Sequence, residues 1–256
     1  MRGIGGRSRR LAGDNQIPTG FRGRFEGHRG RKAVTNLSIR RAVWFSVEGD
    51  LRFVSHHDMM RLMERASARA RLPLKYSQGF NPRPRLSLPL PRPVGVTSRA
   101  ELAIMELDAE PEADWQDVFA RQMPPGLTVL RTQDTSEAAL EPLAVEYEIE
   151  LDPAQVAPVR ARLGELDQQE QWEVLRRGED AGDGPSKRIN LKGRIERFEL
   201  NGDRLSFSLP IEQGNSARPG EVLELLGLAA AGGDASLPPC AEALCRLVRT
   251  AIRCRP

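Results

Sequence analysis

The sequence contains little of what metal sites and disulfide frameworks need. Three Cys and three His occur in 256 residues, and Cys240, Cys245 and Cys254 all lie near the C-terminal end. Three thiols cannot all pair with one another, so the pattern is not that of a disulfide-stapled secreted protein, and we expect a cytoplasmic location. The adjacent His56 and His57 point in different directions on a helix and have no further ligands at close spacing. We therefore predict no metal and no cofactor.

Long apolar runs and aromatic residues are also scarce. Aromatics make up 5% of the chain, and no run approaches the roughly 18 apolar residues of a membrane-spanning helix. The sequence therefore predicts no membrane partner and cores built from aliphatic side chains. Neither a Gly-rich phosphate loop with Lys nor a nucleophile elbow occurs, which leaves no standard catalytic motif.

The formal net charge of +3 conceals a strong asymmetry along the chain. Residues 1–35 hold nine basic and two acidic side chains, residues 36–93 hold eleven and four, and residues 94–256 hold eighteen and twenty-nine. Such a split indicates a polyanionic partner for the first third, of which nucleic acid is the commonest. A charge dipole maintained for solubility is the alternative.

The order of hydrophobic patterns predicts an α+β fold. Strands and helices alternate in two similar halves, which indicates two tandem ferredoxin-like sandwiches with a disordered N-terminal tail. We predict a basic Gly/Arg-rich tail over residues 1–37, a first ferredoxin-like domain over 38–137, a second over 143–228 and a C-terminal extension with a short helix over 229–256. Polar residues 134–142 are read as the linker.

Residues 56–71 are predicted to form an amphipathic helix. Met59, Leu62, Met63 and Ala66 recur at helical spacing, and Ser55 with Asp58 suits a capping box at the helix start. The capping box explains the serine and the aspartate without a functional role. His56 is the candidate catalytic residue, as a general acid or base, and a structural or RNA-contacting histidine is the alternative.

Two basic features follow, one on this helix and one after it. The helix carries three arginines at positions i, i+4 and i+8. Such a row could contact successive phosphates, and an ordinary solvated face is the alternative. The loop over residues 76–85 combines aromatic rings, cations and stiffening prolines, as in sites where bases stack, although a Pro-rich edge strand would also read this way. The predicted RNA- or partner-binding residues are Arg61, Arg65, Arg69, Tyr76, Gln78, Phe80, Asn81, Arg83 and Arg85.

Several blocks resemble one bacterial family. Residues 49–58, 72–73, 76–82, 93–96 and 101, and downstream 188–191 and 216–223, are similar to the radical SAM-linked protein family, the uncharacterised DUF2344 domain. The family histidine corresponds to His56, whereas His57 stands where the family usually shows an apolar residue. The resemblance implies a radical SAM protein as partner, because family members are fused to such proteins or encoded beside them.

The chain does not resemble the radical SAM enzyme itself. That chemistry needs closely spaced thiolates for a four-iron cluster, and Cys240, Cys245 and Cys254 are spaced too widely and are expected as free thiols on a C-terminal helix. The leading interpretation is an RNA-binding accessory protein, without catalysis of its own, that works with a radical SAM enzyme in RNA modification. An endoribonuclease or RNA-modifying enzyme that uses His56 is the first alternative, and a protein-interaction scaffold for a radical SAM partner is the second.

Overall fold

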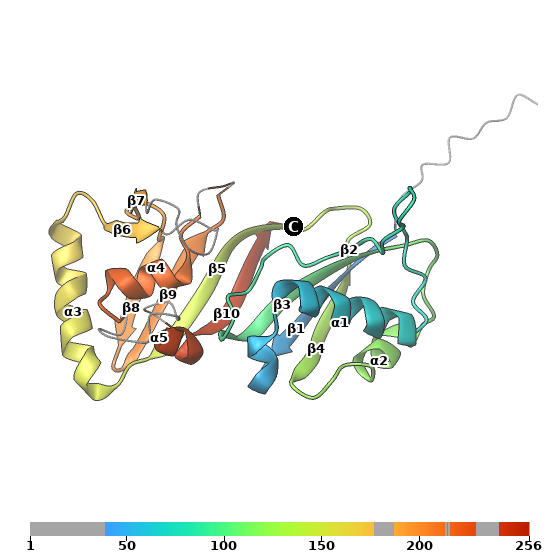
Figure 1. The fold of residues 1–256 in the computed structure, drawn as a ribbon, viewed down its shortest axis with the longest axis horizontal. Helices are drawn as coiled ribbons and strands as arrows, with labels where there is room; N and C mark the ends of the chain where they lie inside the picture. Colours follow the sequence, from blue (N-terminus) through green and yellow to red (C-terminus); the bar gives the residue numbers. More distant parts are fainter. Residues whose placement is uncertain (1–38, 177–186, 213, 215, 229–240, 256) are drawn as a thin grey trace, which may run out of the picture. The chain divides into compact units, whose positions relative to one another are not determined.

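One mixed β-sheet runs through both halves of the sequence (Figure 1). The structure, a computed structural model, describes residues 39–176, 187–212, 214, 216–228 and 241–255. The strands of this sheet are β1 (Ile39–Val47), β2 (Leu86–Ser87), β3 (Thr97–Leu107), β4 (Leu127–Asp134), β5 (Glu141–Glu150), β8 (Arg197–Asn201), β9 (Arg204–Pro210) and β10 (Val248–Arg255). Their order is β4-β1-β3-β10-β5-β9-β8, and β2 pairs with β3 beside this path.

The C-terminal strand β10 joins the two halves, and the sequence did not predict it. It pairs antiparallel with β5 along Val248–Arg255 and parallel with β3 at Val248 and Arg249. The region expected as a C-terminal extension with a short helix contains the helix α5 (Ala241–Arg246), and the central strand β10 follows this helix. Cys245 lies on α5 and Cys254 on β10, and both are free thiols, so the helix predicted for all three cysteines is corrected for Cys254. Cys240 lies outside the described residues.

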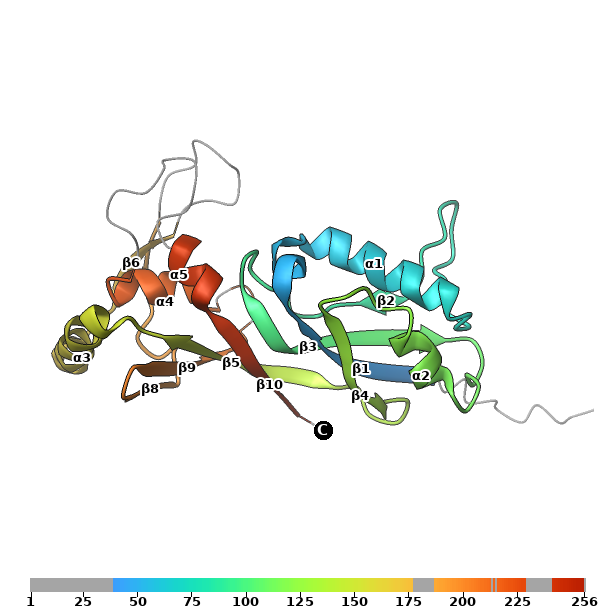
Figure 2. The same ribbon diagram turned by 90° about the horizontal axis from the view of Figure 1, so that it is seen from below.

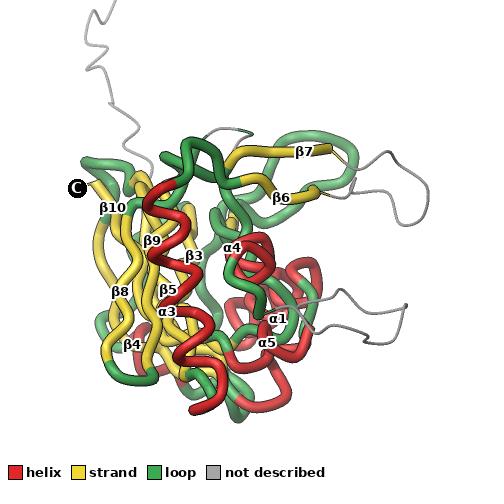
Figure 3. The backbone as a smooth tube through the Cα atoms, turned by 90° about the vertical axis from the view of Figure 1, so that its left-hand side faces the viewer, coloured by secondary structure: helices red, strands yellow, loops and turns green. Residues whose placement is uncertain are grey.

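The helices lie mainly on one side of this sheet, as Figures 2 and 3 show. The first half contributes the 3-10 helix η1 (Gly49–Phe53), α1 (His56–Arg69) and α2 (Trp115–Ala120). The second half contributes α3 (Pro153–Gln168) and α4 (Pro219–Leu225), together with a separate two-stranded sheet of β6 (Glu173–Arg176) and β7 (Lys187–Asn190). None of the helices in these described ranges is long and apolar enough to cross a membrane.

Two hydrophobic clusters form the main cores, one in each half. In the first, Met59, Met63 and Ala66 of α1 pack on Phe45 of β1 and Met105 of β3. The helical stripe predicted from the sequence therefore faces the sheet, as its spacing requires.

The second cluster surrounds β5, β9, α3 and α4, with Tyr147, Val159, Phe207 and Leu223 among its members. Each half thus has its own core, but the sheet between them is continuous through β10. The α+β class is confirmed, whereas two tandem ferredoxin-like sandwiches are not. The domain boundaries stay a prediction, and the tail predicted over residues 1–37 lies outside the described residues.

Candidate functional site

The loop after α1 is a hairpin that holds an aromatic ring in solvent. Tyr76 and Pro84 form an antiparallel bridge, and the amide of Ser77 donates to the carbonyl of Arg83 at 2.8 Å. The amide of Arg83 donates in return to Oγ of Ser77 at 3.0 Å. Phe80 lies at the tip and is fully exposed, at 106%, and Tyr76 is 49% exposed. The Phe80 ring therefore lies in solvent, where a partner can contact it.

The polar residues predicted for this loop are also exposed, but they are not equivalent. Gln78, Asn81 and Arg83 lie on the solvent side of the hairpin. Arg85 lies at its base, where its guanidinium pairs with Glu106 of β3 at 3.3 Å. Arg83 is therefore freer than Arg85 to reach an external anion.

The arginine row of α1 is solvent-facing along most of its length. Arg61 pairs with Asp58 one turn earlier at 3.2 Å, and Arg65 is exposed. Arg69, the last residue of the helix, donates to the carbonyl of Gln122 at 2.6 Å and so ties α1 to the segment after α2. Figure 2 shows the hairpin beside the C-terminal end of α1, so the two predicted basic features are neighbours at that end.

The two histidines at the start of α1 occupy different environments. The Oγ of Ser55 accepts from the amide of Asp58 at 3.2 Å, which confirms the serine as the N-cap. His57 is exposed, whereas His56 is partly buried and lines a void of about 20 Å³ that Arg92 and Glu101 also line. Burial, assisted by the charge of His57, holds the pKa of His56 below its usual value of 6.5. Among the described residues, no group of three or more His, Cys, Asp or Glu side chains could hold a metal ion.

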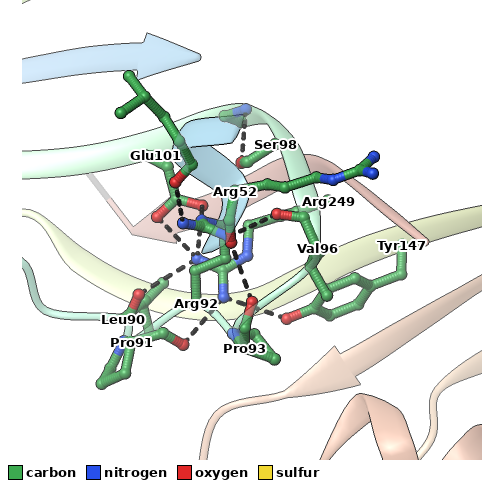
Figure 4. A network of polar contacts seen from close by, with 12 residues as sticks. Arg52, Leu90, Pro91, Arg92, Pro93, Val96, Ser98, Glu101, Tyr147 and Arg249 are labelled. Atoms are coloured by element: carbon green, nitrogen blue, oxygen red, sulfur yellow. Dashed lines mark hydrogen bonds and ion pairs between the residues drawn. The ribbon is translucent and has the colours of Figure 1, made fainter. Parts of the chain in front are cut away.

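A buried polar network, which the sequence did not predict, lies where the two halves meet (Figure 4). The guanidinium of Arg249 on β10 contacts both carboxylate oxygens of Glu101 on β3, at 3.1 and 3.0 Å. It also donates to the hydroxyl of Tyr147 on β5 at 3.2 Å and to the carbonyls of Leu90 and Pro91. Arg249 is 1% exposed and Glu101 is 6% exposed. The network therefore ties three adjacent central strands together.

Arg92 extends this network toward the first half. Its guanidinium donates to the carbonyls of Arg52 at 2.7 Å and Val96 at 2.6 Å, and its Nε lies 3.9 Å from Glu101. Nearby, Gly95 adopts a φ of +91°, and a Cβ there would lie 3.1 Å from Sγ of Cys245 on α5. Glycine at this position therefore permits the close approach of α5 to the loop that carries Arg92.

Burial and charge act in opposite directions on the groups of this network. Burial raises the pKa of the Glu101 carboxyl, and the charge of Arg249, a hydrogen bond from Ser98 and the charge of Arg92 offset this only in part. Burial likewise raises the pKa of Tyr147. Burial lowers the pKa of Arg92, but an arginine remains protonated at physiological pH. The network is thus rich in fixed positive charge.

A cavity of about 680 Å³ adjoins the network on the side of the second half. Arg92, Tyr147 and Arg249 line it from the network, and Val145, Leu209 and Ile211 supply an apolar wall. Arg176 and Arg218 also line it. Arg176 forms a bidentate pair with the buried Glu221 at 2.6 and 2.9 Å, and Glu221 also accepts from the amide of Arg218 at 2.9 Å.

Local sequence patterns could not reveal Arg249 and Tyr147, because their partners are far away in the chain. Arg249 lies 148 residues from Glu101 and 102 residues from Tyr147. The detectable signal was the set of family-like blocks: residues 93–96, 101 and 216–223 are remote in sequence but converge around the network and the cavity.

A protein family matches most of the chain. A family model described as "Uncharacterized protein conserved in bacteria (DUF2344)" matches residues 40–219. This range includes the hairpin, α1, the Arg92–Glu101 segment and most of the residues that line the cavity. A search of curated proteins found no match.

Proposed function

Since the chain belongs to the DUF2344 family of uncharacterized bacterial proteins, we propose that it is an RNA-binding accessory protein that works with a radical SAM enzyme in RNA modification. The observation that carries the proposal is the fully exposed ring of Phe80 at the tip of the hairpin, with Tyr76 and Arg83 exposed on the same loop.

An exposed aromatic ring on a braced loop is suited to stack on an unpaired base. The fully exposed Phe80 ring has no cover from the protein core, so a partner that covers it would remove apolar surface from water. The bridge at Tyr76 and Pro84 and the two hydrogen bonds between Ser77 and Arg83 fix the tip, which lowers the entropy lost on binding. Stacking on a ring tolerates any base, which suits single-stranded RNA.

Basic side chains around the hairpin supply the electrostatic attraction to RNA phosphates in this proposal. Arg83 on the hairpin and Arg65 on α1 are exposed, and Arg69 ends α1 near the base of the hairpin. Residues 36–93 as a whole carry eleven basic against four acidic side chains. Backbone phosphates would contact these cations while a base stacks on Phe80.

The radical SAM partner is proposed on the sequence resemblance. The accessory role agrees with the cysteines of the chain, because Cys245 lies on α5 and Cys254 on β10, whereas a four-iron cluster needs three closely spaced thiolates. In this proposal the partner supplies the radical chemistry, and this chain holds the RNA.

The endoribonuclease alternative depends on His56. The void beside it measures about 20 Å³, which holds about one water molecule and no nucleotide. His56 would therefore have to act on RNA at the surface, without a preformed pocket. This geometry favours binding over catalysis at the start of α1.

Binding of a fluorescently labelled single-stranded RNA, followed by anisotropy, tests the proposal. The wild-type chain should bind, the affinity should fall steeply with salt, and Phe80→Ala should weaken binding by about 1–3 kcal/mol. Phe53→Ala is the matched control, because Phe53 is a second exposed phenylalanine, 49% exposed, on η1. A flat salt response, or equal effects of the two variants, would remove RNA binding through the hairpin.

A second experiment tests the partner. The tagged chain should retain, from its native cells, a protein with closely spaced cluster cysteines together with RNA, as shown by mass spectrometry and by sequencing. If the protein is retained but RNA is absent, and if Phe80→Ala releases the protein, the scaffold interpretation replaces the RNA-binding one.

A further inference from the structure

We propose that the cavity between the network and the apolar wall binds a small organic anion, with its acidic group near Tyr147 and Arg249 and its apolar body against Val145, Leu209 and Ile211. This site is separate from the hairpin and does not depend on RNA binding. The ligand class follows from charge balance, hydrogen-bond capacity and the composition of the cavity.

The charge of the network is not balanced by its own groups. Glu101 is the carboxylate that pairs with Arg249 at 3.0 Å and also lies 3.9 Å from Arg92. The side chains of both arginines are more than nine-tenths buried. Within the described part of the chain no other carboxylate pairs with either arginine, so two buried cations share one anion. Buried charge without a counter-charge costs free energy, and an anion beside the network would lower that cost.

Hydrogen-bond donors of the network are also left over. Arg249 uses its two terminal nitrogens on Glu101, Tyr147 and two backbone carbonyls, while its buried Nε has no hydrogen-bond partner among the described residues. The hydroxyl of Tyr147 accepts from Arg249 and, within the same ranges, donates to no acceptor. Because Tyr147 lines the cavity, we assign its hydroxyl as the donor to the ligand.

The size and the apolar lining of the cavity favour an organic ligand over an inorganic ion. Its volume of about 680 Å³ lies within the range of about 300–1,000 Å³ that is usual for small-molecule sites. Val145, Leu209 and Ile211 line it together with Arg218, and among the described lining residues the exposed Glu212 is the one carboxylate. The acidic group of such a ligand would form charge-assisted hydrogen bonds with the arginines. Its flat or aliphatic body would pack against the apolar wall.

A pair of isosteric probes, naphthoate and naphthamide, isolates the contribution of charge. Binding to the full chain is measured by isothermal titration calorimetry and by the shift in melting temperature. We expect naphthoate to bind and naphthamide to bind about tenfold more weakly or not at all. Equal affinities for the two probes, or no binding of either, would overturn the anion site.

Variants then locate the bound probe. Tyr147→Phe keeps the ring and removes the donor, and we expect about tenfold weaker naphthoate binding. Tyr76→Phe is the matched control, because Tyr76 is the other of the two tyrosines and lies on the hairpin. Equal effects of the two substitutions would contradict the site.

Ile211→Trp places a larger ring at the apolar wall and should weaken naphthoate binding without any change of charge. Unchanged binding to this variant would place the probe elsewhere and overturn the proposal. Phe80→Ala should leave naphthoate binding intact, and Tyr147→Phe should leave RNA binding intact. The failure of either proposal is therefore distinguishable from the failure of the other.

Discussion

The hairpin at Tyr76–Pro84 and the network around Arg249 place similar residue types in opposite environments. Both combine arginine with an aromatic side chain. On the hairpin, Arg83 and Phe80 are exposed and their neighbours in space are neighbours in sequence. In the network, Arg249 and Tyr147 are buried, and their partners come from three strands and one loop. The first arrangement leaves its groups free for a partner, whereas the second uses most of them to hold the fold together.

Breaking the network should produce the largest effect. Arg249→Met leaves the buried Glu101 with Arg92 alone, at 3.9 Å, so we expect a loss of about 3–5 kcal/mol in the free energy of unfolding. Urea denaturation of wild type and variant measures it. Arg83→Met on the hairpin is the matched control and should change stability by less than about 0.5 kcal/mol.

A double variant sharpens this result. Arg249→Met combined with Glu101→Leu removes the closest ion pair of the network but leaves the buried Arg92 without a carboxylate, so it should recover only part of the lost stability. If the single Arg249→Met variant were as stable as wild type, the network would not hold the sheet together.

The next largest effect is expected for a glycine beside the network, and a glycine on the hairpin serves as its comparison. Gly95→Ala should cost about 1–3 kcal/mol, because the φ of +91° is unfavourable for alanine and the new Cβ would crowd Sγ of Cys245 at 3.1 Å. Gly79→Ala on the hairpin also has a positive φ, but nothing lies within 4 Å of its Cβ position, and the exposed loop can adjust. In thermal unfolding, the melting temperature of Gly95→Ala should lie well below that of Gly79→Ala. The reverse ranking would mean that the approach of α5 is not tight.

A smaller effect separates the two arginines of the hairpin. Arg83→Ala should reduce the slope of log K against log salt for single-stranded RNA by about 0.7, as expected for the loss of one phosphate contact. Arg85→Ala should reduce it less, because Arg85 already pairs with Glu106 at 3.3 Å. Equal slopes for wild type and Arg83→Ala would show that Arg83 contacts no phosphate.

The smallest effect is the pH dependence contributed by His56. Its pKa in the folded chain lies below the ordinary value of 6.5 because the side chain is partly buried. At a pH between this lowered pKa and 6.5, the unfolded chain binds more protons than the folded one. His56 therefore favours the fold fully above pH 6.5 and loses this contribution as the pH falls through the lowered pKa. Urea denaturation between about pH 5 and pH 8 should show a slightly shallower pH dependence for His56→Gln.

His57→Gln, on the exposed neighbour, should keep most of the wild-type dependence. If the His57 variant rather than the His56 variant flattened the profile, the assignment of the partly buried histidine would be wrong.

The sequence predicted what depends on local pattern. The α1 stripe of Met59, Met63 and Ala66 was found from its spacing, and Ser55 from its place before an apolar run. Phe80 was placed among the binding residues from the aromatic and basic composition of its loop, and its ring is exposed. Each of these outcomes is decided by residues within a few positions, so one sequence contains the necessary information.

The sequence did not predict what depends on distant pairing. The strand β10 alternates arginine with small and apolar residues, which suits an exposed helix or an edge strand as well as a central one. Arg249 is buried only because Glu101 and Tyr147 meet it from β3 and β5. One arginine among the three of β10 gives no sign of such partners, since the pairing is decided by the assembled sheet.

The central place of β10 also determines the order in which the molecule can fold. β1, β3 and β4 pair with one another, and so do β5, β8 and β9, so each set can form before β10 is synthesised. The two sets connect through a strand that is synthesised after all of them. Closing such long loops is slow, so we expect the newly made chain to pass through two partly formed sheets, in which β5 and the start of β3 lack the partner strand that β10 later supplies. The step that joins them also buries Arg249 beside Glu101, which makes ion pairing a late event of folding rather than its starting point.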